Sequence, residues 1–257
     1  MKKLLHTFLA FGLFFSCSEN KENDLDKANL NGDVKSVYTA SFDAIEKFGE
    51  VTKGEKGQIG VSGKLNGRVY DRVIFDDKGN QIERIVYNFT HKYKYDDIGN
   101  RIENTSYNID GEIHWKKKYK YDDKGNEVEE KHYNKNGGLI FTYKYKYDDK
   151  GNRIERSGYG WPSFDLTSKT KYKYDDKGNE IEEKNYNFEF LSTTLTKYKY
   201  DDKGNEIEEK SYDKKNKLID KTNYEYKFDD KENWIQQIKF IDDKPAFIIE
   251  REIKYYD

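Results

Sequence analysis

Hydrophobic and polar positions alternate along much of the chain. Between Leu139 and Tyr147 every second residue is aliphatic or aromatic, and most residues between them are polar. A period of two is typical of a β-strand with one buried face. The sequence Asp-Asp-Lys-Gly-Asn follows, and Asp and Gly at such positions favour a tight turn. Residues 180–186 show the stretch that comes after such a turn, which predicts the returning strand of a β-hairpin.

This hairpin pattern is repeated along the chain. A Tyr/Phe-Asp-Asp-x-Gly-Asn motif begins at residues 75–80, and its seventh copy, residues 228–233, has Glu232 in place of Gly. Successive copies are 20, 26, 26, 27, 26 and 28 residues apart. Self-similarity at a nearly fixed period predicts a repeat architecture. We therefore predict an all-β fold in which tandem β-hairpins form one curved, open antiparallel sheet.

The second strand of each hairpin has an irregular spacing. Its apolar residues are three and then two positions apart, as in Ile82, Ile85 and Tyr87. A β-bulge would bring such residues to one face, and we predict it at residues 83–84, 182–183 and their equivalents. Lys of first strands and Glu of second strands are expected on the opposite, solvated face. There Lys173 would lie across from Glu182.

The two ends differ from the middle. Residues 33–68 are predicted to form a degenerate first unit with a short helical turn at 44–48, and residues 69–257 to form the repeats. Residues 253–257 resemble a first strand that has no hairpin partner. We expect this segment to close the array as a single edge strand.

The N-terminus has the features of an export signal. Residues 1–16 combine Lys2 and Lys3 with a short apolar stretch and end on a small residue before Cys17, as a cleaved signal peptide does. Residues 13–17, Leu-Phe-Phe-Ser-Cys, resemble the lipobox of bacterial lipoproteins, which implies acylation of Cys17. Cys17 is the only cysteine, so an intramolecular disulfide is excluded. Residues 17–32 are polar and are predicted to be a flexible tether. An ordinary signal peptide with an incidental cysteine is the alternative.

Composition excludes several classes of protein. Charged residues make up 37 % of the chain and mean hydropathy is −1.15, yet 23 Tyr, 15 Phe and only 2 Pro argue against disorder. With 47 basic and 49 acidic residues, the chain lacks the positive charge of a dedicated nucleic-acid binder. The paired aspartates do not have the spacing of a calcium loop, and no pattern predicts a metal or another cofactor.

The repeat also supports a family resemblance. Tyr-x-Tyr-Asp-x-x-Gly-Asn followed by Ile resembles the YD repeat of RHS proteins, and residues 69–257 carry the likeness. The resemblance implies β-hairpins in a long, coiling sheet, which in large RHS and insecticidal-toxin proteins encloses a passenger polypeptide. Short YD-repeat lipoproteins of this kind look like those of the Bacteroidetes lineage.

Aromatic residues are the candidate ligand-binding residues. A stripe of tyrosines is either the core of a thin sheet or an aromatic groove for glycans or peptides. Trp161 belongs to the least repeat-like loop, residues 157–168, which either packs on a neighbouring hairpin or forms an exposed recognition tip. The candidates are Tyr119, Tyr121, Tyr145, Tyr147, Tyr172, Tyr174, Tyr198, Tyr200 and Trp161.

The sequence predicts no catalytic residues. Its four His are scattered singly, and repeated Glu pairs are usually a solvated face rather than the carboxylate pair of a glycosidase. We expect a non-enzymatic, lipid-anchored protein of the outer membrane or cell surface that binds or scaffolds a protein or glycan. A purely structural or toxin-associated accessory is the first alternative, and a glycan-active enzyme is a remote one.

Overall fold

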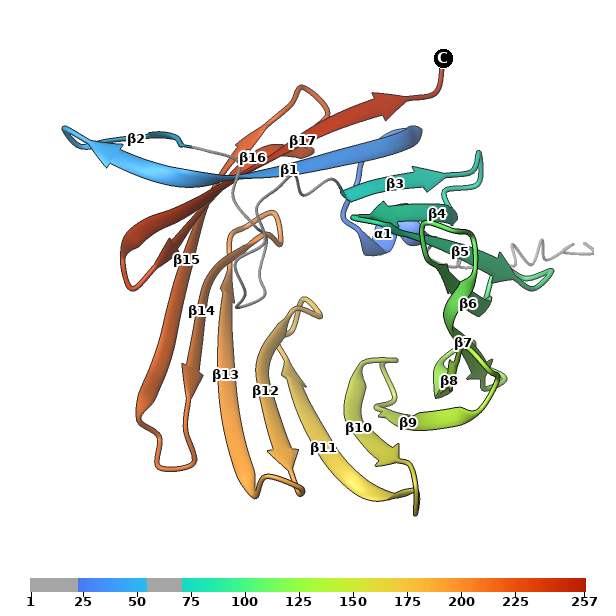
Figure 1. Cartoon of the computed structure of the whole chain (residues 1–257). Helices are drawn as coiled ribbons and strands as arrows, with labels where there is room; N and C mark the ends of the chain where they lie inside the picture. Colours follow the sequence, from blue (N-terminus) through green and yellow to red (C-terminus); the bar gives the residue numbers. More distant parts are fainter. Residues whose placement is uncertain (1–22, 55–70) are drawn as a thin grey trace, which may run out of the picture.

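The structure, a computed structural model, describes residues 23–54 and 71–257 (Figure 1). The signal peptide at 1–16, Cys17 and part of the predicted first unit lie outside the described residues. One short helix, α1 (Asp24–Lys27), precedes the strands. The strands are β1 (Val34–Lys47), β2 (Glu50–Lys53), β3 (Asp71–Phe75), β4 (Gln81–Val86), β5 (Phe89–Tyr95), β6 (Arg101–Tyr107), β7 (Ile113–Tyr121), β8 (Glu127–Asn134), β9 (Leu139–Tyr147), β10 (Arg153–Gly160), β11 (Asp165–Tyr174), β12 (Glu180–Asn187), β13 (Ser192–Tyr200), β14 (Glu206–Tyr212), β15 (Leu218–Phe228), β16 (Trp234–Ile241) and β17 (Lys244–Tyr255).

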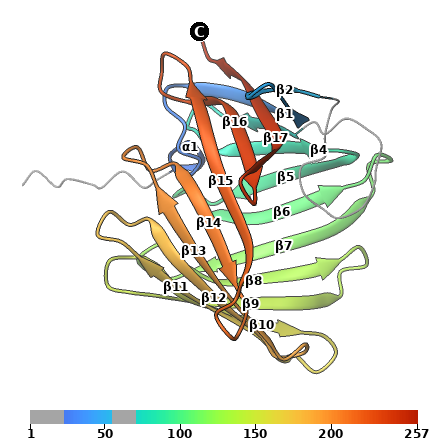
Figure 2. The same ribbon diagram turned by 90° about the vertical axis from the view of Figure 1, so that its left-hand side faces the viewer.

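The sheet is antiparallel and closes on itself. From β3 to β17 each strand pairs with the next, and β1 pairs with β17 along one side and with β3 along the other. The ring therefore contains 16 strands, while β2 forms a hairpin with the end of β1. Figure 1 looks into the ring, and Figure 2 shows the strands crossing the wall between its two rims.

Closure corrects two predictions. The all-β antiparallel fold is confirmed, but the sheet is a barrel rather than an open meander. The segment that ends at Tyr255 is not an edge, because Ile253 pairs with Val37 of β1. Pairing the two ends satisfies the backbone N–H and C=O groups that an open sheet would leave on both edges. Residues 44–47 continue β1 instead of forming a helical turn, and Phe48 and Gly49 have the positive φ angles of a tight connection to β2.

The repeated motif forms the turns along one rim, as the sequence predicts. In the first copy one oxygen of the Asp76 carboxylate accepts the backbone N–H groups of Lys78 and Asn80, and the other accepts the Asn80 side chain. Gly79 has a φ of +78°, which favours glycine. These hydrogen bonds occupy the first carboxylate of each Asp pair within the turn. Among residues 23–54 and 71–257, no three His, Cys, Asp or Glu side chains group to hold a metal ion.

A bulge follows each of these turns, slightly earlier than predicted. Tyr174 pairs with Glu180 but Lys173 pairs with Glu182, so the register shifts at Ile181. The same shift falls at Ile82, where Phe75 pairs with Gln81 and Ile74 with Glu83. The predicted cross-strand pair is confirmed, with 2.8 Å between Lys173 Nζ and Glu182 Oε1. However, Ile181 and Ile82 are exposed on the outer surface rather than buried with the tyrosines.

The tyrosines face the interior of the ring, and the N-terminal segment lies there with them. Figure 1 shows α1 inside the ring. Its Leu25 is buried with Val37 and Phe75, and Tyr255 packs against this cluster. Asn23 caps α1 and also donates a hydrogen bond to the carbonyl of Lys78 in the first turn. The prediction of a flexible tether is therefore wrong for residues 23–32. They are folded because Leu25 and Leu30 supply the apolar contacts that the polar composition hides.

The outer wall is lined by ion pairs that recur in successive hairpins. In each pair a Lys near the end of a first strand lies 2.8–3.3 Å from a Glu at the start of the second. The Lys side chains are 67–70 % exposed. The pairs are Lys94–Glu103, Lys120–Glu129, Lys146–Glu155, Lys173–Glu182 and Lys199–Glu208. No helix within the described part of the chain has the length and apolar character needed to cross a bilayer.

Candidate binding site in the barrel interior

Tyrosines form two rows on the interior wall. In the row beside the turns, each hydroxyl donates to the backbone carbonyl of the first residue of the preceding second strand. Tyr147 and Glu127, for example, are joined in this way at 2.7 Å. The same bond recurs at 2.8–2.9 Å in Tyr121–Arg101, Tyr174–Arg153 and Tyr200–Glu180. In the last hairpin Phe228 occupies the position beside the turn, and Tyr226, two residues earlier, donates to the carbonyl of Glu206 at 2.7 Å. The β-bulge interrupts the strand register directly after the first residue of each second strand. The hydrogen bond from the tyrosine hydroxyl to this residue fixes the orientation of the ring.

The second row contains the tyrosines that lie two residues before those of the first row in each strand, so it is further from the turns. Tyr145 and Tyr172 are buried, whereas Tyr119 and Tyr198 are partly exposed. Burial raises the pKa of each of these four hydroxyls, and nearby carboxylates raise those of Tyr119, Tyr145 and Tyr198 further. The phenols therefore stay neutral at physiological pH and can donate hydrogen bonds. All eight predicted tyrosines lie in these two rows, so the structure brings them together on one wall.

The interior also holds carboxylates that the sequence reasoning placed on the outer face. Burial and the neighbouring Glu130 raise the pKa of Glu127 to about 7. Burial and Glu183 do the same for Glu180, and burial and Glu209 for Glu206. The bulge is responsible, because it turns the first residue of each second strand inward. The constant spacing in the sequence between each of these Glu residues and the tyrosine before the turn, as in Tyr174 and Glu180, is the signal that could have identified the inward-facing carboxylates.

A neighbouring carboxylate, Glu130, is held in a network of hydrogen bonds. Its Oε1 accepts from Lys117 Nζ at 2.8 Å and also contacts His132 Nε2, and its Oε2 accepts a hydrogen bond from the Tyr145 hydroxyl at 2.7 Å. Burial alone would raise the pKa of Glu130, but these partners lower it to about 2. Glu130 is therefore ionised, and its charge disfavours ionisation of Glu127 nearby.

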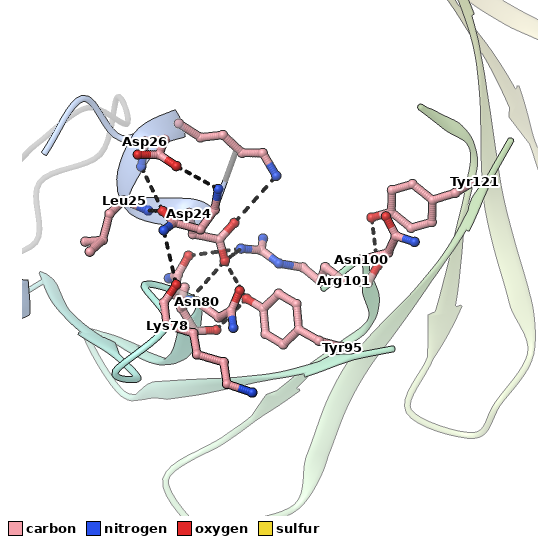
Figure 3. Close-up of polar contacts among 12 residues, drawn as sticks. Asp24, Leu25, Asp26, Lys78, Asn80, Tyr95, Asn100, Arg101 and Tyr121 are labelled. Atoms are coloured by element: carbon pink, nitrogen blue, oxygen red, sulfur yellow. Dashed lines mark hydrogen bonds and ion pairs between the residues drawn. The ribbon is translucent and has the colours of Figure 1, made fainter. Parts of the chain in front are cut away.

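α1 supplies a carboxylate to the interior (Figure 3). Asp24 accepts hydrogen bonds from the Tyr95 hydroxyl at 2.5 Å and the backbone N–H of Gln81 at 2.9 Å, and Arg101 Nη2 lies 2.9 Å away. Burial alone would raise the pKa of Asp24, but the charge of Arg101 and these hydrogen bonds lower it overall. The same contacts raise the pKa of Arg101 despite its burial. Asp24 thus adds a charged contact to the apolar packing of Leu25 and the hydrogen bond of Asn23 that hold α1 against the barrel.

A cavity of about 480 Å³ opens beside α1 at the same rim. Asp24, Lys27 and Arg101 line one side of it, and Glu127 and Arg153 the other. The side chains of Tyr119, Tyr121 and Tyr147 also face it. The cavity thus combines aromatic surface with three cationic and two acidic side chains. It is the kind of concave site that holds a small ligand. Sequence reasoning found its tyrosines but not Asp24, Lys27, Arg101, Glu127 or Arg153.

Trp161 is not part of this interior site. It lies in the connection between β10 and β11, at the opposite ends of the strands from the repeated turns, and it is 69 % exposed. Its interpretation as a packed side chain is therefore wrong, and the exposed tip is the arrangement found. Phe141, rather than Trp161, covers Gly158 and Gly160 of that hairpin.

Comparisons with known proteins match the fold but not the sequence. No family model and no curated protein matches the chain. A porin-like protein from Bacteroides uniformis has a similar structure, with a TM-score of 0.56 and 8 % identity over 87 % of this chain and 98 % of that one. A porin-like protein from Bacteroides vulgatus gives a TM-score of 0.47 and 14 % identity over the same shares. The structure of TcdB2-TccC3-Cdc42 gives 0.33 and 10 % identity over 80 % of this chain and 14 % of that one. The first likeness establishes that this type of closed all-β architecture occurs in a solved structure.

Proposed function

We propose that this chain is a lipid-anchored protein of the bacterial envelope that binds a ligand inside its barrel without catalysing a reaction. A glycan is the ligand that the interior favours, and a segment of an envelope protein is the second class. The observation that carries the proposal is the double row of tyrosines. In the row beside the turns, the hydroxyls donate hydrogen bonds to backbone carbonyls. Rings fixed in this way lose little conformational freedom when a ligand binds, so the free energy gained from contact with the ligand is not reduced by the entropy cost of ordering the side chains.

The interior suits a glycan for two reasons. Flat aromatic rings stack on the apolar faces of sugars, and the charged side chains between the rings can pair with sugar hydroxyl or carboxyl groups. Sixteen strands also make a ring too wide for its own side chains to fill, unlike an eight-stranded barrel. These features support binding over a purely structural role, in which the tyrosines would serve only as core.

The proposed location rests on the N-terminal signal and on the outer wall. Acylation of Cys17 would attach the chain to a membrane by several acyl chains, which is stable where one chain is marginal. Each Lys of the outer ion pairs would cost about 2–4 kcal/mol at the middle of a bilayer. We therefore place the barrel in water beside the outer membrane, held by the lipid. The repeated turns and bulges further support kinship with short YD-repeat lipoproteins.

The test is a glycan array probed with the full-length chain and two variants of strand β7. Tyr121→Ala removes a ring that lines the interior cavity, and Lys120→Ala removes the adjacent outer side chain as a matched control. We expect the unchanged chain to retain one class of glycan, Tyr121→Ala to lose at least about tenfold in affinity and Lys120→Ala to bind normally. Thermal melting by circular dichroism verifies that both variants are folded.

Three results distinguish the alternatives. Equal binding by Tyr121→Ala and Lys120→Ala would place the ligand outside the interior cavity and contradict the proposal. A pull-down from intact cells that captures an envelope protein through Tyr121, with a silent array, would select the protein class. Neither glycan nor protein captured would leave the structural role, and turnover of a bound glycan would select the enzyme.

A further inference from the structure

Two hairpins share an interior arginine that the other hairpins lack. The first residue of each second strand points inward and is bonded through its carbonyl to a tyrosine hydroxyl in all but the last unit. Only the second and fourth units have arginine at this position. In chain order these residues are Gln81, Arg101, Glu127, Arg153, Glu180, Glu206 and Trp234.

The surroundings of the two arginines match closely. Arg101 pairs in register with Tyr95, and Arg153 pairs in register with Tyr147. The Arg101 guanidinium carbon lies 4.4 Å from the ring centre of Tyr93 and 5.8 Å from that of Tyr95. The corresponding distances for Arg153 are 4.2 Å to Tyr145 and 6.0 Å to Tyr147.

Each arginine thus stands in the same frame of rings and hydroxyl groups. Tyr95 donates to the carbonyl of Gln81 at 2.7 Å, and Tyr147 donates to that of Glu127 at 2.7 Å. The two sites are copies of one arrangement, two repeats apart.

The first copy holds a carboxylate. Asp24 of α1 reaches into it and contacts the guanidinium of Arg101, the hydroxyl of Tyr95 and the backbone N–H of Gln81 (Figure 3). A guanidinium and a hydroxyl directed to one point are good partners for a carboxylate, because charge-assisted hydrogen bonds are the strong ones. The protein itself therefore demonstrates what this arrangement binds.

The second copy faces the cavity instead of a side chain of α1. Within residues 23–54 and 71–257, no carboxylate lies within 4 Å of a nitrogen of Arg153. Its Nε is buried and has no hydrogen-bond partner in that part of the chain, as is also true of Arg101, so the two copies differ in the carboxylate alone. The cavity extends from Arg153 to Lys27 and Arg101, and it is walled by Tyr121 and Tyr147.

We propose that Arg153 and Tyr147 bind the carboxylate of an acidic sugar in this cavity, in the way that Arg101 and Tyr95 hold the carboxylate of Asp24. The sugar ring would pack on Tyr121, and Lys27 lies where it adds a second positive charge. This inference rests on the proposed glycan-binding function and names the class of sugar. A cavity of about 480 Å³ is large enough for one or two sugar rings.

Glu127 determines how the site responds to pH. Its Oε1 is buried and has no hydrogen-bond partner in the described ranges, and it lines the same cavity as Arg153. Because its pKa is raised to about 7, Glu127 is largely protonated in mild acid and can then donate to a ligand carboxylate. Above neutral pH it is ionised and repels that carboxylate. The groups that act on Glu127 are Glu130, Arg153, Tyr145 and Arg101, and the further charged groups of the cavity are Asp24 and Lys27.

The test compares galacturonate disaccharide with the neutral galactose disaccharide by isothermal titration of the full-length protein. Arg153→Gln removes the charge and introduces a residue type that Gln81 shows to be accepted at this position. Lys146→Gln removes an outer-wall charge of the neighbouring strand β9 and serves as the matched control. Arg153→Lys keeps the charge but loses the planar fork.

We expect the unchanged protein to bind the acidic disaccharide at least about tenfold more tightly than the neutral one at pH 6. Arg153→Gln should weaken acidic-sugar binding by about 10- to 100-fold with little effect on the neutral sugar, Arg153→Lys should weaken it less, and Lys146→Gln should not change it. Should Arg153→Gln fail to fold, Arg153→Lys gives the decisive comparison.

Equal binding of both sugars by the unchanged protein, or full acidic-sugar affinity in the folded arginine variants, would overturn this inference. If the neutral sugar binds through the tyrosines while the acidic one has no advantage, the proposed function survives and the assignment of Arg153 fails. Absence of binding by either sugar would overturn the assignment of Arg153, and a silent glycan array would in addition reject the glycan function.

Discussion

Replacing Asp24 by asparagine tests how the N-terminal segment is held in the barrel. The substitution keeps the shape of the side chain but removes its charge. Arg101 would then stay largely buried without a counter-ion. The Tyr95 hydroxyl, the Gln81 N–H and Arg101 all contact Oδ2 of Asp24, so the asparagine oxygen can replace this acceptor but not its negative charge. The side chains of Asp24 and Arg101 are 12 % and 26 % exposed, so this is a mostly buried pair.

The expected cost follows from that burial. Removing one partner of a fully buried pair costs about 3–5 kcal/mol, and partial exposure of Arg101 reduces the loss to about 2–4 kcal/mol. Glu232→Gln is the control, because Glu232 pairs with Lys203 where both side chains are at least half exposed. An exposed pair of this kind contributes at most about 1 kcal/mol.

Urea denaturation of both variants measures the free energy of unfolding, and hydrogen exchange of the Gln81 amide reports on α1 alone. The pKa of Asp24 is lowered on folding, so its contribution is present above the ordinary value of 3.8 and is lost as pH falls through the lower folded pKa. Asp24→Asn should therefore be destabilising at pH 7 and close to neutral in strong acid. A loss no larger than that of Glu232→Gln, with unchanged exchange at Gln81, would refute the proposed role of Asp24.

Three further predictions concern the turns, the interior carboxylates and the exposed loop. Asp201→Ala should lower the free energy of unfolding in urea by about 1–2 kcal/mol, because Asp201 accepts hydrogen bonds from the backbone N–H groups of Lys203 and Asn205. The control, Asp202→Ala, should lower it by less than about 0.5 kcal/mol. Equal losses would contradict the turn assignment. Glu180→Gln should stabilise the protein at pH 8 by about 1 kcal/mol after solvent screening and have little effect near pH 4. The reason is that the pKa of Glu180 is raised to about 7 on folding, so the ionised carboxylate makes the folded protein less stable as pH rises from the unfolded pKa to about 7. A stabilisation that does not depend on pH would argue against burial of Glu180 as the cause. Trp161→Ala should change the melting temperature by no more than about 2 °C, and a larger loss would mean that the ring packs.

The local structure could be predicted from the sequence because it depends on neighbouring residues. The Asp-Asp-x-Gly-Asn turns, the strand alternation and the Lys173–Glu182 pair all follow from side-chain chemistry within one hairpin. The irregular spacing of apolar residues also predicts a bulge, but it predicts the bulge at residues 182–183, whereas the register shifts at Ile181. A shift of this size reverses which carboxylates face inward, because the side-chain period of a strand is two.

Closure and the interior site depend on contacts between distant residues, which a single sequence does not reveal. Nothing near Ile253 indicates that its partner is Val37, more than 200 residues away. Asp24 likewise belongs to a polar stretch that resembles a linker, and its role depends on Arg101 being placed opposite it by the fold. Only the two leucines at 25 and 30 distinguish that stretch from a true tether.

The pairing of β1 with β17 provides the most direct test, because the binding proposals require the tyrosines to lie inside a closed ring. Ala40 and Glu250 are register partners across this pairing, and neighbouring strands place such residues within the Cα separation that a disulfide spans. In the chain carrying Ala40→Cys and Glu250→Cys, we predict that oxidation joins the two thiols, as detected by mass spectrometry of the digest. A chain carrying Ala40→Cys and Glu225→Cys should not form the bond, because Glu225 lies on β15. No cross-link in the first chain, or equal cross-linking in both, would contradict the closed barrel.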